Sequence, residues 1–206
     1  MSPPRQSWPT EAEKRFAGYL AELASDEEWN GAGSRSERRA ALHALKRGLR
    51  ADPGLAPETW RHVNGLLADD LDSVSVSAHY LVASLFATHQ LSWEGERSKE
   101  PTNFGASFAR LRDSGSGPTL ENRFVGLLKC RWPALPAHLR RAVGLMRTRD
   151  MPILIDWAQL LHDLRQWQRR DKAVQREWAR AYWREFAEKK PPLDVPAEIA
   201  AAEVEV

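Results

Sequence analysis

The sequence has almost no cysteine and no long apolar segment. Cys130 is the single cysteine in 206 residues, which excludes an internal disulfide framework and a metal site built from several cysteines. It lies in an apolar helical pattern and is expected to be a small core residue. No run of about 18 or more apolar residues occurs, as a membrane-spanning helix would need. The opening segment "MSPPRQSWPT" lacks the apolar centre of a signal peptide. We therefore expect a protein that stays in the cytoplasm.

Catalytic and metal-binding motifs are also missing. The six histidines form no HxxxH or HExxH pair, no GxSxG elbow occurs, and no glycine-rich loop precedes a strand. The acids Asp69, Asp70 and Asp72 could bind a divalent ion, but acids at a helix end with no matching cluster elsewhere are typical of solvated surface. His89 and His162 stand beside apolar helical positions, which is typical of a histidine with a local hydrogen bond. The sequence predicts no enzyme, no metal and no cofactor.

Charge is unevenly distributed along the chain, although the net charge is only +2. Residues 1–96 contain 10 Lys+Arg and 14 Asp+Glu, residues 97–190 contain 20 and 10, and residues 191–206 contain four acids and no Lys or Arg. A half-chain with such an excess of basic residues favours a polyanionic partner, because binding releases counterions. Arginine outnumbers lysine by 23 to 7, which suits forked contacts to phosphate.

The apolar residues follow a helical period almost throughout, and no strand pattern or internal repeat is found. In "TEAEKRFAGYLAEL", Thr10 and Glu13 are spaced as a capping box that starts a helix. "PETWRHVNGLLADDL" places proline in a first turn and is expected to bury Trp60, Val63 and Leu67. "VSAHYLVASLFATHQ" is apolar on more than one side and predicts a central helix. We predict an all-α protein with about eight or nine helices in a two-lobed bundle.

The polar segment "LSWEGERSKEPT" contains glycine and proline and is predicted to connect the two lobes. The last helical stretch is expected to form two helices, about 153–169 and 171–188, with Asp171 capping the second. Several prolines and the lack of a helical stripe in "KKPPLDVPAEIAAAEVEV" predict a disordered acidic tail. The predicted organisation is a flexible N-terminus at 1–9, an N-terminal helical lobe at 10–92, a connection at 93–102, a basic C-terminal helical lobe at 103–188 and the tail at 189–206.

The segment "WAQLLHDLRQWQRRDKAVQREWARAYW" combines tryptophans with arginines, and helical spacing separates the two. Trp157, Trp167 and Trp178 recur on one side and are expected to be core. They could stack on bases only if they were exposed. The arginines fall mostly on other sides, where we expect solvation and helix pairs such as Glu177 with Arg180. These arginines are Arg165, Arg169, Arg176, Arg180 and Arg184.

Better candidates for phosphate binding are basic residues beside short apolar stripes with few acids nearby. They occur in "SFARLRD", "ENRFVGLLKCRW" and "HLRRAVGLMRTR". Arg123 and Lys129 are six residues apart, about 9 Å along a helix axis, which is close to the reach of adjacent phosphates. Together the three segments predict a continuous basic face made by Arg110, Arg112, Arg123, Lys129, Arg140, Arg141 and Arg147.

These segments resemble the CasB family, the small subunit of the type I-E CRISPR surveillance complex Cascade. The resemblance is carried by "HYLVASLFATH", "SFARL", "ENRFVGLL", "HLRRAVGLM", "IDWAQLLHDLRQW" and "VQREWARAYW", within a match that runs in the same order from about residue 35 to 186. Each motif alone is little more than a helix with Trp or Arg, whereas their order, spacing and total length are together specific. In the N-terminal part, Lys46 and Arg47 in "ALKRGL" correspond to an arginine pair of the family. The first 30 residues and the acidic tail have no clear counterpart.

The resemblance implies an all-helical, two-lobed protein without catalytic activity. In such complexes two copies pack head to tail along the inner belly, between the large PAM-reading subunit and the repeat-processing subunit, beside the backbone subunits that hold the guide RNA. Their basic surface steadies the guide–target hybrid and the displaced DNA strand, so that the R-loop lasts long enough to recruit the nuclease-helicase. Carried over residue by residue, the implied nucleic-acid-binding positions are Lys46, Arg47, Arg97, Lys99, Arg110, Arg123, Lys129, Arg140 and Arg141.

Three other functions remain open on the sequence. A helical adaptor could use the same basic face to bind an acidic protein partner. A helix-turn-helix regulator would need a short turn before its recognition helix, and the connection in "LRDSGSGPTLENRF" is too long for that motif. An enzyme comes last, because no catalytic constellation is found.

Overall fold

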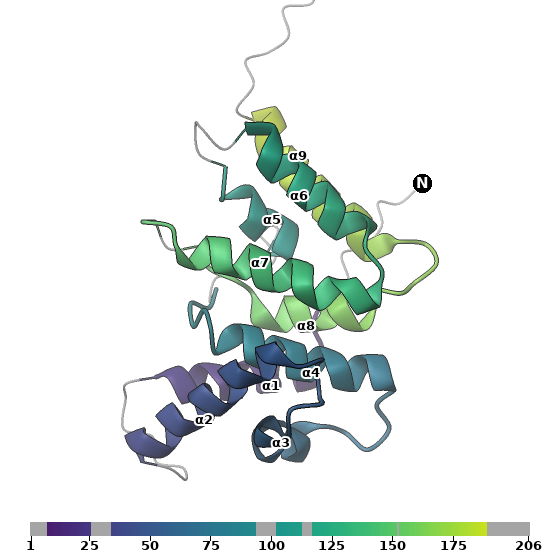
Figure 1. The fold of residues 1–206 in the computed structure, drawn as a ribbon. Helices are drawn as coiled ribbons and strands as arrows, with labels where there is room; N and C mark the ends of the chain where they lie inside the picture. The colour runs from purple at the N-terminus through teal and green to yellow at the C-terminus, as the bar shows by residue number, and fades with distance from the viewer. Residues whose placement is uncertain (1–7, 26–33, 94–101, 113–116, 152, 189–206) are drawn as a thin grey trace, which may run out of the picture.

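The computed structural model describes residues 8–25, 34–93, 102–112, 117–151 and 153–188. Every regular element in these ranges is a helix (Figure 1), apart from a single isolated β-bridge between Ser92 and Ile155. The prediction of an all-α protein is therefore confirmed. The α-helices are α1 (Glu11–Ala24), α2 (Arg35–Arg47), α3 (Pro57–Val63), α4 (Ser73–Phe86), α5 (Phe104–Ala109), α6 (Gly117–Lys129), α7 (Leu135–Arg147), α8 (Trp157–Arg165) and α9 (Ala173–Glu188), with 3-10 turns η1 (Gly48–Arg50), η2 (Asn64–Leu66) and η3 (Trp132–Ala134).

Helix starts are fixed by local hydrogen bonds that the sequence signals. Thr10 and Glu13 form the predicted capping box of α1: the Thr10 hydroxyl accepts from the Glu13 N–H at 3.3 Å, and the Thr10 N–H donates to the Glu13 carboxylate at 2.7 Å. Asp72, a candidate ion ligand in the sequence, caps α4 and accepts from the Ser75 N–H at 2.7 Å. Such caps stabilise a helix by about 1 kcal/mol each.

The helix α4 lies at the centre of the molecule, as its sequence predicts. Its residues from Ala78 to Phe86 are all buried. Figure 1 shows α4 and α8 crossing the middle, with α1, α2 and α3 on one side and α5, α6, α7 and α9 on the other. The helix α8 packs against both α4 and α1. Residues from both halves of the chain thus share one apolar core, and the division into two lobes stays a prediction.

The helices α5 and α9 approach each other closely because Gly105 has no side chain. A Cβ atom placed on Gly105 would lie 2.1 Å from the carbonyl oxygen of Trp178. Trp178 is fully buried, and its ring lies 5.2 Å from that of Phe104. The tryptophans of the C-terminal segment are core residues as predicted, since Trp157 and Trp167 are also at most 2% exposed.

Two details differ from the sequence-based prediction: the length of the helix that begins near residue 153, and the burial of Trp60. The predicted helix at 153–169 is shorter at both ends: α8 begins at Trp157, after a segment in which Ile155 pairs with Ser92, and it ends at Arg165. Asp171 accepts from the Ala173 N–H at 3.2 Å, as a cap for α9 should. The predicted burial of Trp60 is wrong: its side chain is 44% exposed, while Val63 is buried. The helix α3 has only two turns and buries Thr59 and Val63, which are four residues apart, so Trp60 is rotated toward solvent and donates to the Gly54 carbonyl at 2.9 Å.

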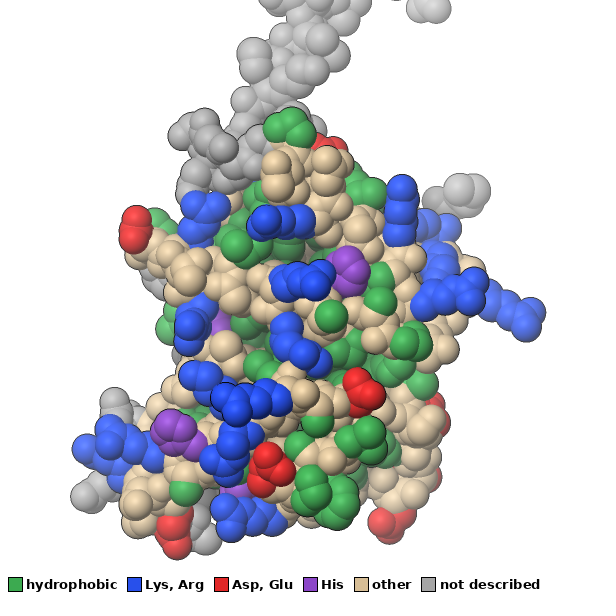
Figure 2. All heavy atoms as spheres, in the orientation of Figure 1, with side chains coloured by type: hydrophobic (Ala, Val, Ile, Leu, Met, Phe, Trp, Pro, Cys, Tyr) green, Lys and Arg blue, Asp and Glu red, His purple; other side chains and the backbone are tan. Residues whose placement is uncertain are grey.

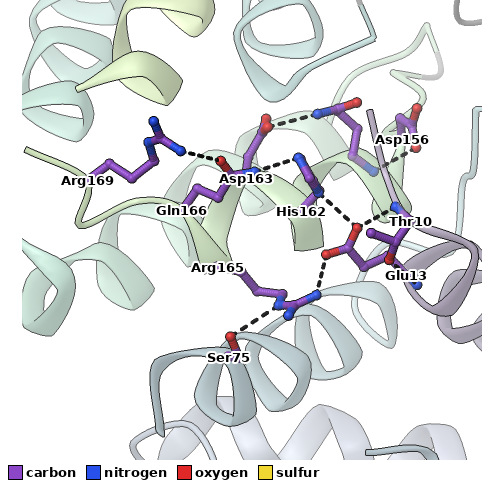
Figure 3. Close-up of polar contacts among 10 residues, drawn as sticks. Thr10, Glu13, Ser75, Asp156, His162, Asp163, Arg165, Gln166 and Arg169 are labelled. Carbon is purple, nitrogen blue, oxygen red and sulfur yellow. Dashed lines mark hydrogen bonds and ion pairs between the residues drawn. The ribbon is translucent and has the colours of Figure 1, made fainter. Parts of the chain in front are cut away.

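A buried polar cluster joins α1 to α8 (Figure 3). The Glu13 carboxylate accepts from Arg165 Nη1 at 2.6 Å and lies 2.9 Å from His162 Nδ1. Arg165 Nε donates to the Ser75 hydroxyl at 3.1 Å, which brings α4 into the cluster. Burial acts to raise the pKa of Glu13, but hydrogen bonds from His162, the Thr10 N–H and Arg165 hold this pKa at about 2.

This cluster corrects one prediction about α8. Arg165 was expected to be solvated, but it is bonded to a buried acid, because α1 covers that side of α8. His162 makes the expected local contact, since its Nε2 lies 2.5 Å from the Gln166 amide nitrogen, and it also bonds to Glu13, which is far away in the chain. His89, also expected to bond locally, instead has its Nε2 2.7 Å from the carbonyl of Ile153, which is distant in the sequence.

A second buried acid lies on the other side of α8. Asp163 accepts from the Trp178 indole N–H at 2.6 Å and from the Gln159 amide at 2.8 Å. Burial raises the pKa of Asp163 to about 7, against the effect of these two hydrogen bonds. Glu13 and Asp163 together fix α8 between α1 and α9.

Candidate nucleic-acid interface

The helices α6 and α7 turn their apolar sides into the core and their basic sides outward. Phe124 and Leu127 of α6 are at most 1% exposed, and so are Leu139 and Met146 of α7. The helical period explains why Arg123 is exposed, because it directly precedes the buried Phe124 and therefore lies on another side of α6. The connection Cys130–Ala134 is short and includes η3, so the two helices remain packed against each other.

A groove of about 590 Å³ lies between α6 and α7. The structure brings Arg123 of α6 and Arg141 of α7 to this one groove, although they are 18 positions apart in the sequence. No acidic residue is among those that line it, which are Phe108, Asn122, Arg123, Gly126, Leu127, His138, Arg141, Ala142, Gly144, Leu145 and Thr148.

Basic residues continue from the end of α7 to α2. A hollow of about 290 Å³ is lined by Arg147 and Arg149 together with Gln90. Gln90 also lines a hollow of about 330 Å³ on α2. The basic residues and the histidine of that second hollow are Arg35, Arg38, Arg39, His43 and Lys46.

Figure 2 shows Lys and Arg side chains following one another down the side of the molecule formed by α6, α7 and α2. Acidic side chains are few among them in this view. We call this surface the basic face and define it by the exposed arginines and lysines of these helices that line the groove or one of the two hollows. Its members are Arg35, Arg39, Lys46, Arg123, Arg141 and Arg147.

The charges of the basic face are largely uncompensated. Among the described residues, no carboxylate lies within 4.0 Å of the charged nitrogens of Lys46, Arg123 or Arg141. Arg47 differs, because its Nε lies 3.8 Å from Glu58. Asp150 lines the hollow beside Arg147. Cations without a nearby carboxylate are free to bind phosphate.

The other predicted positions lie in less uniform surroundings. Arg110 is exposed directly after α5. Arg140 is half-buried, and its Nε is enclosed without a hydrogen-bond partner among the described residues. Lys129 is exposed at the end of α6, near the α8–α9 turn, since the Trp167 indole donates to the Cys130 carbonyl at 3.2 Å. Arg97 and Lys99 lie outside the described residues.

Arg112 was expected to contribute to the face but has a packing role. Its guanidinium carbon lies 3.6 Å from the centre of the Tyr182 ring, and its Nη1 donates to the Tyr182 carbonyl at 3.4 Å. A cation stacked on a tyrosine in this way holds α9 next to the segment that follows α5.

Sequence reasoning did not include Arg35 and Arg39 among the candidate residues of the basic face. Both are exposed on α2 and line the same hollow as Lys46. A signal was present, because residues 35, 39, 43 and 46 recur at the spacing of one helix face. Arg147 was predicted as part of the basic face. Its neighbourhood to α2 could not be predicted, because it depends on Gln90, which lines both hollows and is far from Arg147 in the sequence.

The remaining candidates for chemistry do not form a site. In the part of the chain that the structure describes, no three His, Cys, Asp or Glu side chains are grouped as metal ligands would be. Burial raises the pKa of Cys130 to about 11, so its thiol stays protonated. Within the described ranges, none of the helices combines the length and apolar content needed to cross a bilayer.

Comparison with known proteins gives consistent similarities. The model of the family described as "CRISPR-associated protein Cse2" matches residues 38–183. A protein of that description from Thermus thermophilus is 32% identical over 171 residues, which cover 82% of this chain and 89% of the relative.

Solved structures with the same fold include CasB proteins. CasB from M. ruber has a TM-score of 0.67 at 30% identity, covering 87% of this chain and 96% of its own. CasB from Thermus thermophilus has a TM-score of 0.64 at 28% identity, covering 83% and 97%. A chain of a structure named "CRISPR RNA-guided surveillance complex" has a TM-score of 0.66 at 24% identity, covering 86% and 95%, which shows likeness of fold.

Proposed function

Because the chain belongs to the CRISPR-associated Cse2 family, we propose that it is a non-catalytic subunit of a CRISPR RNA-guided surveillance complex. Its partners are the guide RNA, the target and displaced DNA strands, the other subunits of the complex and a second copy of itself. The shared fold with a chain of a solved complex of that description supports this assembly. This proposed subunit requires no cofactor and acts in the cytoplasm.

The observation that carries the proposal is the basic face. Helices from both halves of the chain contribute arginines and lysines to one side of the molecule, with few carboxylates among them (Figure 2). A surface of this kind binds a sugar–phosphate backbone through charge and does not select a sequence. Base pairing with the guide supplies the sequence recognition.

The energetics of strand exchange explain why backbone contacts are enough. A guide–target hybrid is about as stable as the DNA duplex that it replaces, so the exchange is nearly balanced. A few additional phosphate contacts therefore shift the equilibrium toward the open R-loop. Arginines suit this role because the guanidinium can bind two phosphate oxygens at once.

The test is the lifetime of the R-loop in a reconstituted complex. The variant Lys46→Gln/Arg123→Gln/Arg141→Gln removes three exposed charges of the basic face, and we expect the R-loop to dissociate about tenfold or more faster, if each contact contributes about 0.5–1 kcal/mol. The control variant Arg61→Gln/Arg176→Gln/Arg180→Gln removes the same charge from exposed positions on α3 and α9. An R-loop that is equally long-lived with both variants would exclude the basic face as the binding surface.

The same variants distinguish our proposal from the alternative, a helical adaptor that binds an acidic protein. An acidic protein partner bound to the basic face would remain bound after nuclease treatment and would be lost with the Lys46/Arg123/Arg141 variant. Under our proposal, nuclease treatment releases whatever that face retains, and the isolated chain binds oligonucleotides.

A further inference from the structure

We propose that the groove between α6 and α7 receives an unpaired base of single-stranded DNA, while Arg123 and Arg141 hold the phosphates on either side of it. This inference rests on the proposed function and adds a base-contact site to a protein whose basic face alone would bind only backbone. The occupant is a nucleotide of the displaced strand.

The floor of the groove is apolar and open. Leu127, Ala142 and Phe108 lie beneath it and are at most 3% exposed, so core packing fixes its shape, and the half-buried Leu145 supplies apolar surface that solvent reaches. Gly126 and Gly144 lie on facing helices and have no side chains to fill the space. A Cβ atom on Gly144 would meet no heavy atom within 4 Å. At about 590 Å³, the groove falls in the range of about 300–1,000 Å³ found for small-molecule sites.

The rim of the groove is cationic and polar. Arg123 and Arg141 lie on opposite helices, with Asn122, His138 and Thr148 beside them, and no acid lines the groove. Neither arginine has a carboxylate within 4.0 Å among the described residues. The guanidinium groups are therefore available to an anion that sits over the groove.

The apolar floor and the cationic rim together fit a nucleotide better than they fit a free phosphate or an apolar side chain. A free phosphate would use the rim but leave the apolar floor empty. An apolar side chain of a protein would fill the floor but leave two cations without an anion. A nucleotide has a flat, uncharged base for the floor and phosphates for the rim, and an arginine can also stack on the base.

The displaced DNA strand is the source that offers unpaired bases. In an R-loop the bases of guide and target are paired with each other, whereas the bases of the displaced strand are not. Trp157, Trp167 and Trp178 cannot provide a stacking surface, because all three are buried. The groove provides an apolar surface that remains accessible next to the basic face.

The experiment compares two single-stranded DNA oligonucleotides of equal length binding to the full chain at low salt. One contains the fluorescent base 2-aminopurine among normal bases, and the other consists of abasic sites with the same number of phosphates. We expect the abasic strand to bind about tenfold more weakly, the effect of losing one or two base contacts. The 2-aminopurine fluorescence should change on binding as the base leaves water.

The variant Gly144→Leu fills the groove without changing charge. Leucine favours a helix more than glycine does, so loss of folding is not expected. The base-containing strand should then bind about as weakly as the abasic strand, whose affinity should not change. The matched control is Gly18→Leu, at an exposed helical glycine of α1 where a Cβ also meets nothing within 4 Å, and it should bind both strands like the unmodified chain.

Three results would overturn the inference while leaving the proposed function intact. They are equal, salt-sensitive affinity of the unmodified chain for both strands, unchanged binding by Gly144→Leu, and a Gly144→Leu variant that loses both strands equally. Any of them would assign the groove to another occupant, such as a side chain of a neighbouring subunit. Failure of the proposed function looks different, because then neither strand binds in a salt-dependent way.

Discussion

The carboxylate of Glu13 shows how one side chain can tie distant parts of the chain together. It is buried at 1% exposure and meets His162 and Arg165 of α8 while it completes the cap of α1. A buried acid with this many donors stays ionised, and removing it leaves a cation without its partner. Glu13 therefore has a structural role, and its consequences can be measured through pH.

We expect Glu13→Gln to destabilise the protein at pH 7 by about 2–3 kcal/mol. The pKa of Glu13 is about 2 in the folded protein, below the ordinary 4.5. Its contribution is therefore present above pH 4.5 and is lost as pH falls toward 2. Urea unfolding from pH 7 to pH 3 should show the difference between the two proteins shrinking on acidification. The control Glu11→Gln, at an exposed position, should leave stability unchanged. A pH-independent difference would contradict the assignment.

For Asp163 we expect stability to depend on pH in the opposite direction. Burial raises its pKa to about 7 from the ordinary 3.8, so the folded state keeps a proton that the unfolded chain releases near pH 4. Stability therefore falls as pH rises from about 4 to 7, by an amount on the order of 1–3 kcal/mol. Asp163→Asn removes the titrating group and should flatten this decline in urea unfolding measured across the same range. An unchanged slope in the variant would show that Asp163 titrates normally.

At the scale of elements, the contact between α5 and α9 depends on one missing side chain. Gly105 allows the backbone of Trp178 to approach within a distance that a Cβ atom would occupy. The basic segment after α5 depends on the same contact, since Arg112 stacks on Tyr182 of α9. A strain introduced at Gly105 would move both helices, because α5 packs against α9 along its length.

We expect Gly105→Ala to lower the free energy of unfolding by about 1–3 kcal/mol, because the added methyl group collides with backbone that cannot yield easily. Thermal unfolding is the appropriate measurement. Gly18→Ala in α1 is the matched control, because its Cβ meets nothing within 4 Å and alanine should stabilise that helix by about 0.4–1 kcal/mol. If both variants shifted the unfolding temperature upward, α5 and α9 would not be in such close contact.

At the scale of the whole molecule, the basic face joins residues that come from separate parts of the chain. Gln90 lines both the hollow that contains Lys46 of α2 and the hollow that contains Arg147 of α7, and Arg141 belongs to the same helix as Arg147. The extended residues 153–156 and α8 then return the chain to α1 and α4, which fixes the two halves relative to each other. Electrostatic attraction to a nucleic acid is a property of this assembled surface, so salt should reveal it.

We expect the isolated chain to bind single-stranded DNA of any sequence with an affinity that falls steeply as salt rises. The Lys46→Gln/Arg123→Gln/Arg141→Gln variant should lower the slope of log affinity against log salt by about 2, since each lost phosphate contact contributes about 0.7. Fluorescence anisotropy at several salt concentrations measures this slope. A variant that weakens binding with no change in slope would show that these three residues do not contact phosphates.

The sequence predicted much of the element-level structure, because its signals are local. The Thr10–Glu13 capping box, the buried α4 and the Asp171 cap all follow from residues within a few positions of each other. The pair Glu177–Arg180, which also depends on neighbours in one helix, is present with an N–O distance of 2.6 Å. Predictions failed where a helix side was assigned to solvent or core without knowing what covers it, as at Trp60 and Arg165.

By itself, then, the sequence determined that the chain is helical, which residues form apolar stripes and which segments carry basic side chains. Only the tertiary structure decided that Arg165 bonds to Glu13, that Arg112 stacks on Tyr182, and that Arg123 and Arg141 line one groove with an apolar floor. The physical reason is that helical period and capping depend on residues three or four positions apart. Which sides of different helices become neighbours depends on how the helices cross, and this is set by packing between residues that are distant in the sequence.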